Sequence, residues 1–229
     1  MITERDISVL RFINQFGFSS TSMVQSVFFK NLANSCAMRV TRRRIQHLHE
    51  RGLLKKQTHP DFSERIYSLT QSGSLEIERR GFESIKGLDH INWSEFHHDF
   101  EIQKIYLRFR DLGYTKFYSE RKAREETPFG ELIPDLIMFK SDNRTVMIEV
   151  ELTRKTYKRM EEKLKEYIDS PHLGTLLYIC KTDGIVTAIS KTAKKFDELN
   201  GRFNAMTVTE FFSKNADDFI HSIMQGKVC

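Results

Sequence analysis

Three acidic residues fall within two short apolar segments whose composition is typical of strands. Asp135 lies in the segment 132–139, and Glu149 and Glu151 lie in the segment 145–152. Side chains alternate along a strand, so Glu149 and Glu151 share one face. If the two segments pair as a hairpin, the three carboxylates meet on one surface of a sheet. Their mutual repulsion is costly unless a proton or a cation relieves it, and oxygen ligands of this kind suit Mg²⁺ or Mn²⁺.

A divalent ion at this surface predicts metal-assisted cleavage of a phosphodiester. The ion would polarise a phosphoryl oxygen and lower the pKa of a bound water. Asp135 and Glu149 are the predicted ligands, and Glu151 is a candidate for positioning or deprotonating the water. Lys155 follows soon after the second strand, where its ammonium would neutralise charge that develops on the phosphate.

The elements around these residues predict an α/β core. A helix over 93–112 carries apolar residues on two nearly opposite sides, so it is expected to be buried. The continuous apolar run at 174–180 is typical of a buried parallel strand. The predicted order α-β-β-β-α-β-α-β-α belongs to an α/β fold. The other predicted elements are strands at 116–120 and 205–208, helices at 153–170, 185–200 and 209–224, and a charged, exposed segment at 120–126.

The first ninety residues carry the whole excess of positive charge. They hold 14 Lys and Arg against 9 Asp and Glu, whereas the remaining residues hold 22 of each, which indicates binding to a polyanion. Helical patterns over 3–16, 21–29 and 35–51 precede two strand-like stretches on either side of a polar turn at 59–61. Thr3 is the predicted N-cap of the first helix. Three helices followed by a two-stranded wing predict a winged helix-turn-helix.

The third of these helices carries a run of arginines. In a winged helix-turn-helix this helix enters the major groove of double-stranded DNA, where arginines clamp phosphates or read guanines. A basic helix is also compatible with a merely solvated face. The predicted DNA-binding residues are Arg39, Arg42, Arg43, Arg44, Lys55 and Lys56.

The acidic segments resemble the core of the PD-(D/E)XK nuclease superfamily. The resemblance rests on Pro-Asp at 134–135 and Glu-Val-Glu at 149–151. The second motif of that superfamily normally ends in lysine, where this chain has Glu151. Glu151 is therefore open to three roles, as a base, a metal ligand or a bystander, and Lys155 is open to the role of the missing lysine. The superfamily also draws an acid from the helix before the hairpin, which implies Glu101 as a further metal ligand.

Longer stretches resemble MobC-type plasmid relaxases and the related replication-relaxation family, whose members pair a winged helix with a nuclease-like domain. The matching stretches are HHDFEIQ at 97–103, PDLIMF at 134–139 and MIEVELTRK at 147–155, while RRRIQHLHERGLLKK at 42–56 and IYSLTQSG at 66–73 resemble winged-helix regulators.

We therefore expect a two-domain chain of mixed α and β structure. A winged helix-turn-helix DNA-binding domain spans 1–80, a linker spans 81–92, and a PD-(D/E)XK nuclease-like α/β domain spans 93–229. The resemblance implies that the protein nicks or relaxes plasmid DNA at a transfer or replication origin.

A second reading keeps this fold without the cleavage. If Glu149 and Glu151 are paired with arginines, the second domain is an inactive scaffold, and the protein is a DNA-binding regulator of plasmid replication or transcription. The missing motif lysine favours the regulator, whereas Asp135 and the clustered acids favour the nuclease.

Composition also bounds location and partners. No segment approaches the length of a membrane span, and the start lacks a secretory signal. Three widely spaced cysteines are typical of thiols in a reducing compartment. We therefore expect a cytoplasmic protein with no membrane partner. Besides double-stranded DNA at a plasmid origin region, a second copy of the chain and a mobilization or coupling protein are compatible partners, and the sequence does not decide between them.

Overall fold

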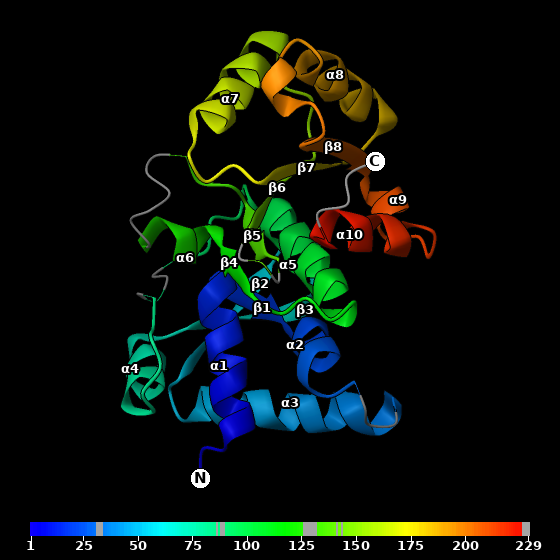
Figure 1. Ribbon diagram of the computed structural model, residues 1–229. Helices are drawn as coiled ribbons and strands as arrows, with labels where there is room; N and C mark the ends of the chain where they lie inside the picture. The colour runs from blue at the N-terminus through cyan, green and yellow to red at the C-terminus, as the bar shows by residue number, and fades with distance from the viewer. Residues whose placement is uncertain are drawn as a thin grey trace. The chain divides into compact units, whose positions relative to one another are not determined.

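The computed structural model (Figure 1) describes residues 1–30, 34–85, 87, 90–125, 132–140, 142 and 144–225. Contacts between residues divide the chain into two units, 1–104 and 105–229. Each unit has its own sheet, with three strands in the first and five in the second.

The first unit begins with a helix that is capped as the sequence predicts. The hydroxyl of Thr3 accepts the Asp6 N–H, and the Asp6 carboxylate accepts the Thr3 N–H, so two amides at the helix start are satisfied. The strands form an antiparallel sheet of order β1-β3-β2. The elements are α1 (Glu4–Phe16), β1 (Phe18–Ser20), α2 (Thr21–Phe28), α3 (Asn34–Glu50), β2 (Leu54–His59), β3 (Phe62–Leu69) and α4 (Gln71–Arg79).

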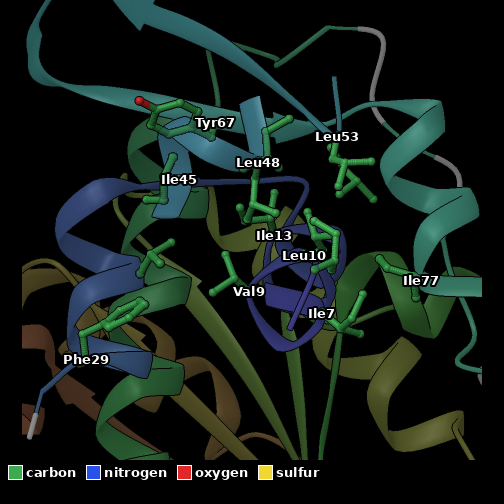
Figure 2. Packing of buried hydrophobic residues seen from close by; sticks show 14 of the residues in the cluster. Ile7, Val9, Leu10, Ile13, Phe29, Ile45, Leu48, Leu53, Tyr67 and Ile77 are labelled. Carbon is green, nitrogen blue, oxygen red and sulfur yellow. The ribbon is translucent and has the colours of Figure 1, made fainter. Parts of the chain in front are cut away.

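Apolar residues spaced three and four apart on α1 and α3 build the core of this unit. One cluster buries Leu10 and Ile13 of α1 together with Ile45 and Leu48 of α3 almost fully. Figure 2 shows these side chains packed together, with Tyr67 of the sheet in the same cluster. This packing fixes the exposed face of α3, because a helix with one apolar stripe turns its other side to solvent.

The division between the units falls inside α5 (Phe96–Asp111), after Lys104. The predicted linker, 81–92, therefore lies within the first unit. The physical reason is that the start of α5 packs on this unit: the fully buried ring of Phe96 stacks on Phe18 of β1, with 5.1 Å between ring centroids.

The second unit is a mixed sheet of order β4-β5-β6-β7-β8, in which β4 to β6 are antiparallel and β6 to β8 are parallel. The two parallel connections each contain a helix, as parallel pairing requires. The strands are β4 (Phe117–Ser119), β5 (Leu136–Phe139), β6 (Thr145–Glu151), β7 (Thr175–Cys180) and β8 (Phe203–Thr207), and the helices are α6 (Glu120–Glu125), α7 (Tyr157–Asp169), α8 (Asp183–Ala193), α9 (Val208–Phe211) and α10 (Ala216–Gln225), with a short 3-10 turn η2 (Asp197–Leu199).

Helices α7 and α8 cover one face of this sheet. Met147 of β6 is buried in a cluster with Leu164 of α7 and Ile189 of α8. Side chains two apart on a strand point the same way, so Glu149 and Glu151 face these helices too. Within the described ranges, no helix combines the length and the apolar character that crossing a bilayer demands.

Candidate functional site

Asp135 lies where the two central antiparallel strands meet. It directly precedes β5, and its carboxylate accepts the Val150 N–H of β6 at 2.7 Å. The pairing of Leu136 with Ile148 in the same hairpin brings Asp135 close enough to Glu149 for their charges to interact. The two predicted metal ligands therefore lie beside each other.

Glu149 is the most enclosed acid of the group. Its side chain is 2% exposed, and one carboxylate oxygen accepts a hydrogen bond from Lys163 Nζ of α7 at 2.7 Å. The other oxygen accepts a hydrogen bond from the hydroxyl of Tyr167, which lies one helical turn after Lys163 on α7. Both carboxylate oxygens are therefore held by α7, so this helix forms one wall of the site.

The electrostatics of this group follow from its burial. Burial, and then the charge of Asp135, raise the pKa of Glu149 from 4.5 to about 7, against the opposite influence of Lys163 and Tyr167. Burial is the largest influence on the pKa of Lys163 and lowers it, but the carboxylates of Glu149, Asp135 and Glu151 together outweigh burial and the pKa is raised. Burial, followed by the charge of Glu149, raises the pKa of Tyr167 well above its usual value. Glu149 is thus the group that exchanges its proton near neutral pH.

Glu151 and Lys155 form a second pair at the end of β6. Their charged groups are in direct contact, with 8% and 27% of the two side chains exposed. The adjoining crevice is also lined by Arg159 and Lys163 and has a volume of about 10 Å³, roughly what a single water needs. Lys155, Arg159 and Lys163 are spaced four residues apart, so three cations line one crevice beside the buried acids.

The carboxylate oxygens of this site suit a divalent ion, but those of Glu149 and Glu151 already pair with Lys163 and Lys155. Carboxylate oxygens are ligands that Mg²⁺ and Mn²⁺ prefer, and Asp135 and Glu149 supply two such groups. Among the residues that the structure describes, no group of three or more His, Cys, Asp or Glu is placed to hold a metal ion. An ion bound by Glu149 would have to displace the ammonium of Lys163, which provides the compensating positive charge in this arrangement.

Glu101, the further ligand implied by the resemblance, belongs to the first unit. Its side chain is 15% exposed, and its carboxylate pairs with Lys104 at 2.8 Å on the same helix. The structure thus brings together Asp135 and Glu149, with Glu151 and Lys155 at the adjoining crevice, and places Glu101 in an ion pair of its own.

The first unit carries an open groove between α3 and β3. Its volume is about 800 Å³, and its positive lining residues are Arg42 and Arg43 of α3 and Arg65 of β3. Glu64 also lines the groove, and its carboxylate accepts the N–H and hydroxyl of Ser22 at 3.0 and 2.8 Å. Three guanidinium groups therefore line one concave surface, and such a concentration of positive charge suits a polyanion.

The other predicted DNA-binding residues differ in their surroundings. Arg39 is exposed on α3, and Lys55 and Lys56 are exposed on β2. Arg44 instead contacts the buried carboxylate of Asp6 at the start of α1, through two of its nitrogens. Burial opposes the effect, but hydrogen bonds from Arg44 and Thr3 hold the pKa of Asp6 below its usual value. Arg44 thus links α3 to α1.

Three contributors to these sites were not predicted: Lys163, Tyr167 as a partner of Glu149, and Arg65. The sequence contains a signal for the first. The apolar stripe of α7 is formed by Met160, Leu164 and Tyr167, and Lys163 lies next to this stripe. A lysine at the edge of a buried stripe needs a partner, and Glu149 is the partner that it finds.

Comparison with family models matches residues 10–175, well over half of the chain, to the family described as replication-relaxation. Comparison with curated proteins and with solved structures gives no match.

Proposed function

Because the chain belongs to the replication-relaxation family, we propose that it binds double-stranded plasmid DNA through its first unit and nicks it at a transfer or replication origin through its second. The family supports a role in plasmid replication or relaxation. The observation that carries the catalytic part of the proposal is the half-buried Asp135 beside the buried Glu149, which binds Lys163.

In the proposed complex the first unit acts as a winged helix-turn-helix. Helix α3 enters the major groove, and the β2–β3 hairpin is the wing. Arg42 and Arg43 on α3 and Arg65 on β3 border the same groove, so a phosphate backbone passing along it would meet positive charge from both sides. Arg39, Lys55 and Lys56 would add contacts with phosphates at its edges.

The second unit acts as a PD-(D/E)XK-like nuclease in this proposal. Asp135 and Glu149 would hold Mg²⁺ or Mn²⁺, which would supply a water of lowered pKa and polarise the phosphoryl group. Hydrolysis joins the water oxygen to phosphorus and breaks the bond from phosphorus to one sugar oxygen. Glu151 takes the proton that the water loses, and the departing sugar oxygen takes a proton from solvent. Lys155 holds the carboxylate of Glu151 in position.

A second candidate function is a DNA-binding regulator built on an inactive nuclease-like domain. The observation that favours it is the pairing of both glutamates of β6 with lysines, Glu149 with Lys163 and Glu151 with Lys155. In that case the lysines stabilise the fold permanently and no ion replaces them. The two candidates predict the same binding of DNA and differ only in cleavage.

Cleavage of a supercoiled plasmid that bears its cognate origin tests the proposal. With Mg²⁺ or Mn²⁺ the wild type should produce relaxed circles, and chelator, Asp135→Ala or Glu149→Ala should lower the rate by about 100-fold or more. Asp142→Ala is the matched control, because this exposed acid follows β5 in the same hairpin and pairs only with Arg144 among the described residues. Origin-specific binding without nicking in any metal would instead support the regulator, and relaxation that survives both site variants would place the active site elsewhere.

A further inference from the structure

Lys163 supplies a positive charge that strand β6 does not itself provide at the proposed cleavage site. The strand ends in Glu-Val-Glu at 149–151, so it provides acids but no cation toward a scissile phosphate. We propose that Lys163 of α7 is the cation of the cleavage site and contacts the phosphate that is cut. This assignment rests on the proposed function and specifies which residue neutralises the substrate.

The position of Lys163 is fixed by its helix. Thr156 caps the start of α7, with its hydroxyl accepting the Arg159 N–H at 3.3 Å. Met160 and Leu164 are buried against the sheet, one on each side of Lys163 in the sequence. The backbone of Lys163 is therefore anchored above β6, at a distance that lets its ammonium reach Glu149 at 2.7 Å.

The head of the same side chain remains able to meet a substrate. The side chain of Lys163 is 28% exposed, against 2% for Glu149, so its ammonium lies between the buried acid and the crevice. Long lysine side chains bury their carbon stem and turn the charged end to the open side. The exposed Arg159 lines the same crevice, so it adds positive charge beside Lys163 at the surface that would face a phosphate.

The surroundings of the two lysines in this crevice distinguish them. Lys155 contacts Glu151, at the end of β6. Lys163 contacts Glu149 at 2.7 Å, and the hairpin places Glu149 beside Asp135. Lys163 is therefore the cation in contact with the predicted metal ligands, and a phosphate that approaches Asp135 and Glu149 meets it.

The test compares three purified full-length variants, Lys163→Met, Lys163→Arg and the matched control Lys158→Met, which changes a lysine of the same helix that is 87% exposed and pairs with Glu162. Each is measured for plasmid cleavage with Mn²⁺, for affinity to an origin duplex, and for Mn²⁺ affinity by calorimetry without DNA. Lys163→Met should cleave about 100-fold or more slowly, while Lys163→Arg should recover much of that loss and Lys158→Met should stay within a few-fold of wild type. Affinity for the duplex should be unchanged in all three.

Affinity for Mn²⁺ separates a role toward phosphate from a merely structural one. Removing the ammonium relieves competition for Glu149, so Lys163→Met should bind Mn²⁺ at least as tightly as wild type while cleaving poorly. Loss of Mn²⁺ binding together with cleavage would mean that Lys163 only holds the acids in place, and would overturn the assignment. Cleavage that survives Lys163→Met overturns it too. A wild type that cleaves nothing in any metal overturns the proposed function, and this assignment with it.

Discussion

Glu149 shows how a single buried side chain can control the properties of a site. An isolated carboxylate in the interior is too costly to maintain. Here Lys163 and Tyr167 bind its two oxygens, yet burial and Asp135 still hold its pKa at about 7. The residue therefore changes charge within the physiological range of pH, where most glutamates stay ionised.

This shift predicts a pH dependence of stability. In the folded protein Glu149 keeps its proton up to about pH 7, whereas the unperturbed side chain loses it near 4.5. The folded state binds more protons between these values, so the contribution of Glu149 to the free energy of unfolding falls as pH rises from about 5 to 7. Glu149→Gln cannot ionise, and its stability relative to wild type should increase across that window in chemical denaturation.

The control for this prediction is Glu162→Gln, which changes an exposed glutamate of helix α7 with 58% of its side chain accessible. Its stability curve should run parallel to that of the wild type from pH 5 to 8. If the Glu149→Gln curve also runs parallel, the carboxyl group is ionised throughout and the raised pKa is wrong.

At the scale of an element, helix α3 divides its arginines between two tasks. Arg43 is exposed along the groove, while Arg44 contacts Asp6, which is 1% exposed. Arg43→Gln should therefore weaken binding to the origin duplex about five- to tenfold at 0.1 M salt, through the loss of one phosphate contact, with stability unchanged within about 0.5 kcal/mol.

Arg44→Gln should instead lower the stability of the fold and leave the affinity for DNA nearly unchanged. It leaves the Asp6 carboxylate without its guanidinium and should lower the free energy of unfolding by about 1–3 kcal/mol. Affinity for the duplex should stay near the wild-type value, provided that binding is measured below the unfolding transition. Anisotropy with a labelled duplex and thermal denaturation measure the two quantities. Equal losses of affinity in both variants would mean that Arg44 also reaches the DNA.

The elements with strong local signals were predictable from sequence, and those set by contacts were not. Thr3 marks the start of α1 correctly, because the capping box that it forms with Asp6 is a local interaction. The charged segment 120–126 was expected to be an exposed loop or the end of a strand, but residues 120–125 form α6. The predicted helix 209–224 is two helices, α9 and α10, and α4 was not predicted.

The candidate site shows the same limit. Alternation along a strand correctly placed Glu149 and Glu151 on one face, since the period of a strand is independent of tertiary structure. That Lys163 reaches Glu149 depends on how α7 packs against the sheet, fourteen residues later in the chain. The roles assigned to these residues, and the fold families of the two units, remain predictions of the resemblance.

At the scale of the whole molecule, charge is divided as the proposed tasks require. Residues 1–90 hold all of the net positive charge of +5, and residues 91–229 are balanced, with 22 residues of each sign. Nonspecific attraction to DNA should therefore come mainly from residues 1–90. Residues 91–229, being neutral as a whole, would engage the phosphate through specific groups rather than through a general field.

The salt dependence of DNA binding tests this division. Each phosphate that the protein neutralises contributes about −0.9 to the slope of log K against log salt concentration. If Arg42 and Arg43 both contact phosphates, the double variant with glutamine at both positions should have a slope less negative by about 1.8.

Asp135→Ala with Glu149→Ala should leave the slope unchanged, because those acids lie in the second unit. Binding measured by anisotropy between 50 and 200 mM salt, a range over which such contacts produce large changes, gives both slopes. If the double variant has the same slope as the wild type, the groove of the first unit is not the surface that binds DNA.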